Sequence, residues 1–105
     1  MALMNREAAL STGKRFASQV RTEIDNKALV LLFGSCAKNE TTERSDIDIA
    51  VVSEAFGDNY IDNFIKIGKI AYNIDVEIEP HPFTLESWNN ITSFISEIKK
   101  TGVVL

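Results

Sequence analysis

The uninterrupted apolar run at residues 28–33 (Ala-Leu-Val-Leu-Leu-Phe) constrains this chain more than any other segment. A strand with one face in water alternates apolar and polar residues, whereas a strand covered on both faces is apolar throughout. The run therefore predicts a central strand with packed layers on both sides of it. Gly34 and Ser35 follow at once and end the strand in a turn.

Helical and strand periodicities elsewhere can supply those layers. Behind Asn5, a suitable N-cap, residues 6–24 place Phe16 and Val20 at helical spacing and predict a first helix. Residues 74–79 alternate apolar and acidic side chains, as a half-buried strand does. Further strands are predicted at residues 47–52 and 103–105, and further helices near residues 61–71, 85–88 and 91–98.

The order helix, strand, strand, helix, strand, helix predicts an α/β (α+β) fold, a small mixed sheet with helices packed on it. The pairing sense of the first two strands stays open. Pro80-His81-Pro82 is predicted to stop the third strand, because proline removes a ladder donor. In the long helix, Ile61, Phe64, Ile65, Gly68 and Ala71 form the apolar face of an amphipathic pattern.

Composition sets further limits. At 105 residues the chain is expected to form a single domain, residues 1–105. A net charge of −4 disfavours a broad nucleic-acid surface, and the apolar runs are too short to cross a bilayer. The start of the chain soon turns polar, unlike a signal peptide. Cys36 is the single cysteine, so we expect no internal disulfide and a reducing cytoplasm.

Two acidic patterns suggest where chemistry takes place. Asp46 and Asp48 are two residues apart at the second predicted strand, so their carboxylates share one face. Asp75, Glu77 and Glu79 share a face of the third in the same way. If the two strands are neighbours, these carboxylates repel one another unless cations compensate them. Such oxygen ligands suit Mg²⁺, which fills the rest of its shell with water and substrate phosphates.

The Gly34-Ser35 turn is the second candidate feature. Glycine allows a close approach to the backbone, and Ser35 offers a hydroxyl and an N–H suited to phosphate. Lys38 adds a positive charge nearby. A Gly-Ser turn or an Asp-x-Asp pair alone is more often an ordinary turn or a solvated face. Their combination in this order favours a phosphate cradle facing metal ligands.

The stretch Leu32-Phe33-Gly34-Ser35-Cys36-Ala37-Lys38, followed by Ser45-Asp46-Ile47-Asp48-Ile49-Ala50-Val51-Val52, closely resembles the signature of the DNA polymerase beta-like nucleotidyltransferase superfamily. The chain's small size and its Asp75-Val76-Glu77-Ile78 segment are similar to the minimal nucleotidyltransferase branch. The resemblance implies a metal-dependent enzyme with a nucleotidyltransferase-like fold.

Position by position, the resemblance implies that Asp46 and Asp48 are the catalytic metal-binding pair. A third carboxylate comes from the later strand, with Asp75 the first choice and Glu77 the second.

The resemblance also assigns the triphosphate to Gly34 and Ser35. The family commonly has arginine and then glycine after this segment, where Lys38 and Asn39 stand here. Lysine keeps the charge but loses the planar fork of arginine.

The implied mechanism is two-metal nucleotidyl transfer with Mg²⁺ or Mn²⁺. One ion activates an acceptor hydroxyl, while the other binds the nucleoside triphosphate and stabilises the leaving pyrophosphate. AMP is the expected group. Larger relatives carry helical domains for which this length leaves no room, so we expect a separate helical partner. The minimal branch resembles proteins that accompany a HEPN-domain protein and adenylylate its tyrosine in a toxin–antitoxin pair.

Two alternatives stay open: a weakly active or inactive antitoxin or scaffold that binds a helical partner, and a plain α/β domain with a solvated acidic face. Self-association is also open. For four residues the structural interpretation is favoured over a site role. Cys36 is expected to pack and His81 to lie in a turn, while Phe83 and Trp88 are expected to close the core.

Overall fold

The computed structural model describes residues 5–38 and 46–105. In chain order the elements are α1 (Arg6–Glu23), β1 (Leu29–Phe33), β2 (Ile47–Val52), α2 (Tyr60–Ile74), β3 (Ile78–Phe83), α3 (Leu85–Asn89), α4 (Ser93–Thr101) and β4 (Val103–Val104). Within these ranges the strands form one mixed sheet in the order β3-β2-β1-β4. β1 is antiparallel to β2 and β4, and β2 is parallel to β3. The predicted α+β fold is confirmed, and the first two strands prove to be antiparallel.

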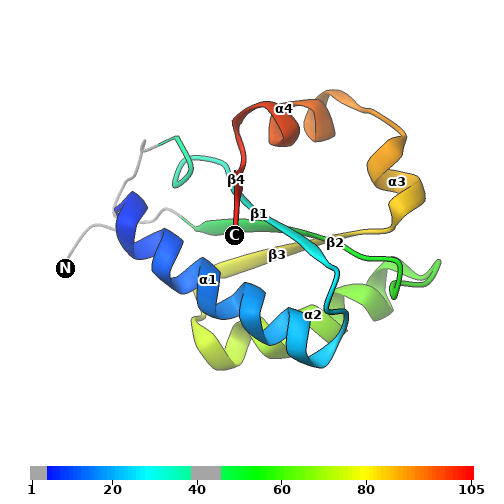
Figure 1. The fold of residues 1–105 in the computed structure, drawn as a ribbon, viewed down its shortest axis with the longest axis horizontal. Helices are drawn as coiled ribbons and strands as arrows, with labels where there is room; N and C mark the ends of the chain where they lie inside the picture. The colour runs from blue at the N-terminus through cyan, green and yellow to red at the C-terminus, as the bar shows by residue number, and fades with distance from the viewer. Residues whose placement is uncertain (1–4, 39–45) are drawn as a thin grey trace.

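Helices cover both faces of this sheet, with α1 and α2 on one side and α3 and α4 on the other (Figure 1). Alternate residues of β1 enter the two cores: Leu32 packs with Phe16 of α1, and Phe33 packs in the cluster that contains Trp88 and Ile98. This two-sided burial explains the continuous apolar run and confirms the prediction made from it. None of the described helices is long and apolar enough to cross a bilayer.

The third strand lies further along the chain than its alternation predicts. The prediction of a strand at residues 74–79 is wrong, because α2 continues to Ile74 and β3 spans Ile78–Phe83. Asp75 ends the helix, and its carboxylate accepts a hydrogen bond from the Glu77 N–H at 2.8 Å. The acidic residues before β3 therefore belong to a turn that the Asp75 side chain closes.

The prediction that residues 80–82 stop the strand is also wrong. Within the sheet described, β3 is an edge strand paired with β2 alone. The carbonyls of Glu77 and Phe83 accept hydrogen bonds from Ile47 and Ser53 at 2.9 and 3.1 Å. Odd-numbered residues of β3 thus direct their backbone groups toward β2. The two prolines occupy even-numbered positions, whose amides would face the open edge, so the pairing loses no donor.

The apolar face predicted for the long helix is mostly exposed, because only Ala71 of its five residues is buried. The residues of α2 that enter the core are Asn63, Ile67, Ile70 and Ala71. The α2 stripe, defined as five residues exposed by 41–73%, consists of Tyr60, Ile61, Phe64, Ile65 and Tyr72. The helix therefore carries two apolar sectors, of which one packs on the sheet and the other faces water.

α4 packs on the sheet through Ile95 and Ile98, while its Phe94 is exposed, as is Ile91 just before the helix. Replacing Ile98, which is 1% exposed, by alanine is expected to lower the free energy of unfolding by about 2–5 kcal/mol. Ile91→Ala, at a 58% exposed position, is expected to change it by less than about 0.5 kcal/mol. Denaturant titrations of both variants measure the difference, and equal losses would contradict this packing.

Candidate active site

The Gly-Ser turn lies directly against Asp48. Gly34 has φ = 76°, a left-handed conformation that glycine adopts without strain. The Lys38 N–H donates to the Gly34 carbonyl at 3.2 Å and closes a helical turn that contains half-buried Ser35. A Cβ at Gly34 would lie 2.6 Å from Asp48 Oδ2. The structure thus brings Gly34 of the predicted phosphate cradle close to Asp48 of the predicted metal-binding pair.

Three carboxylates converge beside this turn. Asp46 immediately precedes β2, and Asp48 lies within it on the sheet face that α3 and α4 cover. Glu79 of β3 is paired in register with Asp48. The pKa of Glu79 is raised, first by loss of water around it, then by repulsion from Asp48 and by contact with Asp46, with His81 opposing. A raised pKa among neighbouring acids indicates charge that the described side chains compensate incompletely.

His81 was predicted to lie in a turn, and that prediction is wrong. It lies within β3, two residues after Glu79, and its Nε2 is 3.2 Å from Asp48 Oδ1. One ligand atom each from Asp48, Glu79 and His81 lie within 4.8 Å of one another. Such a set of oxygen and imidazole donors can hold a divalent ion.

The shift of the third strand changes which residue can be the third carboxylate of the cluster. The choice of Asp75 or Glu77 rested on a strand that does not exist at those positions, since both residues lie in the turn before β3. The residue brought beside Asp48 is Glu79 instead. Glu79 follows Asp75 and Glu77 at steps of two residues, so strand periodicity places it on the same face. That spacing is the signal in the sequence by which it could have been found.

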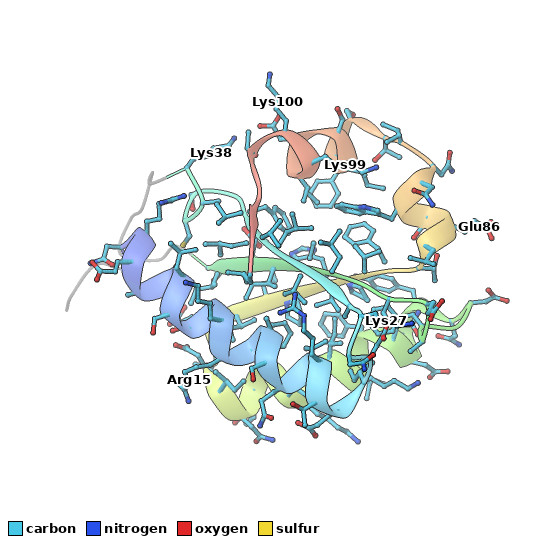
Figure 2. The ribbon with its side chains drawn as sticks, viewed as in Figure 1. Arg15, Lys27, Lys38, Glu86, Lys99 and Lys100 are labelled. Carbon is cyan, nitrogen blue, oxygen red and sulfur yellow. The ribbon has the colours of Figure 1, made fainter. Side chains whose placement is uncertain are left out.

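The predicted phosphate ligand Lys38 is engaged elsewhere in the structure. Its Nζ lies 3.1 Å from a Glu97 carboxylate oxygen of α4, and both side chains are partly exposed. Figure 2 shows Lys38 on the α4 side of the sheet. A solvent-exposed pair of this kind contributes little stability, so an incoming phosphate can compete for the ammonium. Asn39, the other departure from the family pattern, lies outside the described residues.

Cys36 packs in the core, in agreement with the structural interpretation. It is fully buried, and its thiol donates to the Asp46 carbonyl at 3.3 Å. Burial, and secondarily the charges of Asp48 and Asp46, raise the pKa of this thiol. The nucleophile is the thiolate, so this environment disfavours covalent chemistry at Cys36.

The two aromatic residues weighed as base-stacking candidates also belong to the core. Phe83 and Trp88 meet edge to face at 5.2 Å between ring centroids, and Trp88 is only 8% exposed. Lys99 of α4 lies 5.1 Å from the centre of the Trp88 ring, where a cation–π contact holds it. In Figure 2 Lys99 and Lys100 lie at α4, as expected for charges in its last turn.

The chain matches the family model of the nucleotidyltransferase domain over residues 14–103, which covers the Gly-Ser turn and the whole carboxylate cluster. A search of curated proteins found no match. The chain belongs to the nucleotidyltransferase domain family, and its class of chemistry is nucleotidyl transfer. A divalent metal is typical of such chemistry, and the Asp48, Glu79 and His81 donor set suits one.

Proposed function

We propose that this chain transfers a nucleoside monophosphate, AMP in the first instance, from a triphosphate to a hydroxyl acceptor. The observation that carries the proposal is the close approach of Gly34 to Asp48, where an added Cβ would lie 2.6 Å from Asp48 Oδ2. It supports a phosphate-binding role for the turn beside the carboxylate cluster. Asp46, Asp48 and Glu79 would hold divalent ions, and Gly34, Ser35 and Lys38 would hold the triphosphate.

In the proposed reaction the chain aligns the triphosphate with the acceptor hydroxyl and compensates the charge of the phosphates. Bound divalent ions would lower the pKa of the acceptor hydroxyl and neutralise the triphosphate. The acceptor oxygen bonds to the α-phosphorus while the bond from that phosphorus to the bridging oxygen breaks. Pyrophosphate leaves, and the hydroxyl proton passes to solvent. The backbone N–H groups of the turn at Ser35 orient the phosphates for this displacement.

As acceptor we propose a tyrosine of a separate helical, HEPN-type protein, as in a toxin–antitoxin pair. The α2 stripe supports a protein partner, because contiguous exposed apolar side chains commonly mark an interaction surface. An apolar helix face of this kind fits a helical groove. Cys36, a free thiol, suits the reducing cytoplasm as the compartment.

The same stripe favours a second candidate function, a scaffold that binds the helical partner without turnover. Phe64, exposed by 41%, lies near its centre. Phe64→Asp would then abolish partner binding, while substitutions at Asp48 would leave it unchanged. Sizing of the isolated chain tests the remaining possibility, that a second copy occupies the stripe.

One labelling experiment tests the proposed reaction. The protein is incubated with α-labelled or γ-labelled ATP, GTP, CTP or UTP and Mg²⁺ or Mn²⁺, with and without the product of a neighbouring gene. We expect transfer of the α-label with release of pyrophosphate, and no transfer of the γ-label. Transfer of the γ-label would instead indicate a phosphotransferase. No transfer of either label under any condition would favour the scaffold.

A further inference from the structure

His81 is placed to contact whatever ion the carboxylates hold. It follows Glu79 by two residues on β3, so the two side chains project from the same face of the strand. Its register partner on β2 is Ala50, a small buried residue that leaves room beside Asp48 for the imidazole. The His81 Nε2 to Asp48 Oδ1 distance of 3.2 Å puts the ring nitrogen at the cluster.

Neighbouring aromatic rings fix the orientation of the His81 ring. Phe33 meets it edge to face, with 5.0 Å between ring centroids and an interplanar angle of 64°. The ring of Phe94 of α4 lies 6.1 Å from the His81 ring between centroids, tilted by 56°. The His81 side chain is 24% exposed. A ring held in this way loses little rotamer freedom when its nitrogen binds an ion, which strengthens ligation.

An imidazole donor changes which ion the site prefers. Mg²⁺ favours oxygen ligands and retains several waters, whereas first-row transition ions accept nitrogen readily. We propose that His81 supplies a nitrogen ligand to the ion held by Asp48 and Glu79 and makes this site select Mn²⁺ over Mg²⁺. The inference rests on the proposed function, because the ion is the one that the transfer reaction would use.

The test measures ion binding without turnover. Mn²⁺ binding to the wild type and to His81→Gln is followed by electron paramagnetic resonance, and Mg²⁺ binding is measured by competition. We expect the ratio of Mn²⁺ to Mg²⁺ affinity to fall at least about 10-fold in His81→Gln, since even outer-shell partners of metal ligands contribute that much. Electron spin echo spectra should show imidazole nitrogen coupled to Mn²⁺ in the wild type and none in the variant.

A second variant, His81→Ala, keeps the inference testable if His81→Gln does not fold. His81→Ala should lose the nitrogen coupling, and added imidazole should restore it by entering the space beside Phe33. An unchanged affinity ratio, or a wild-type spectrum without nitrogen coupling, would overturn the inference. So would a His81→Gln protein that loses transfer but keeps its preference for Mn²⁺, which would assign His81 to proton transfer.

Failure of the inference and failure of the proposed function give different results. If the carboxylate site is correct and only His81 is misassigned, Mn²⁺ still binds and Asp48→Asn still abolishes binding, while His81→Gln has no effect. If the wild type binds neither ion, or binds Mn²⁺ equally well after Asp48→Asn, the proposed metal site itself fails and the inference fails with it.

Discussion

Replacing Asp48 with asparagine is expected to abolish nucleotidyl transfer while stabilising the metal-free protein. Asparagine keeps the size of the side chain but removes a charge from the centre of the carboxylate cluster. Charge stabilisation through a bound ion contributes several kcal/mol to the transition state, so we expect transfer to fall by at least about 1,000-fold. Incorporation of α-label from ATP measures the loss.

The gain in stability follows from Glu79. Its pKa lies above the usual 4.5, first because burial removes water around it and then because Asp48 repels its charge, so the folded state holds this proton more tightly than the unfolded chain does. That contribution to stability is present below about pH 4.5 and is lost as the pH rises through the raised pKa. Removing the Asp48 charge weakens the repulsion. In EDTA at pH 8, Asp48→Asn should therefore melt at a higher temperature than the wild type.

Asp58→Asn is the matched control, because it makes the same chemical change at an exposed position in the loop before α2. We expect it to change neither transfer nor the melting temperature appreciably. Near wild-type transfer by Asp48→Asn would place the chemistry elsewhere on the chain. A metal-free Asp48→Asn protein that melts below the wild type at pH 8 would show that Asp48 stabilises the apo fold.

The first half of the candidate site could be predicted from the sequence, because local pattern decides it. Residues 47–52 form the predicted strand without any shift, and Asp46 and Asp48 share a face because strand periodicity leaves no alternative. The predicted proximity of Gly34 to this pair is confirmed at Asp48, whose Oδ2 would lie 2.6 Å from a Cβ at Gly34. For this part of the site, strand periodicity, the glycine at the turn and the order of the motifs all favour the same arrangement.

The second half of the candidate site could not be predicted, because residues 74–79 fit the pattern of a strand although the first of them ends the helix α2. Residues 74–79 satisfy strand alternation, yet helix packing extends α2 to Ile74 and the Asp75 side chain closes the following turn. Odd-numbered residues still share one face of the shifted strand, so the face on which Glu79 lies was predicted correctly. The position along the strand was predicted wrongly, and Glu79 instead of Asp75 is paired in register with Asp48.

Local sequence pattern also does not show whether a strand lies at the edge of the sheet, or which sector of a helix is exposed. Pro80 and Pro82 stop a strand only where their missing amides would be paired, and at the open edge of β3 they are not. In α2, Ile61 and Ala71 both belong to the predicted apolar face, but only Ala71 is buried in the core. Which sector of a helix is buried depends on its neighbours, and a sector exposed here is a candidate for contact with another protein.

Gly34→Ala is expected to damage the fold and the site together. A side chain at φ = 76° costs about 1–2 kcal/mol, which should appear as a lower free energy of unfolding in denaturant titrations. The new Cβ would also lie 2.6 Å from Asp48 Oδ2, so the carboxylate must move away from its place in the cluster. Displacement of a reacting group by about 1 Å can cost 100-fold in rate, and we expect a loss of transfer of that size together with weaker Mn²⁺ binding.

Gly57→Ala separates the contact at Asp48 from the general effect of adding a methyl group. A Cβ at Gly57 meets nothing within 4 Å, so the substitution should be neutral or stabilise the fold by up to about 1 kcal/mol. If Gly34→Ala lost stability but bound Mn²⁺ as tightly as the wild type, the turn and the carboxylates would be independent. Weaker binding in Gly34→Ala alone would mean that the backbone at Gly34 sets the position of Asp48, and with it the distance between triphosphate and ion.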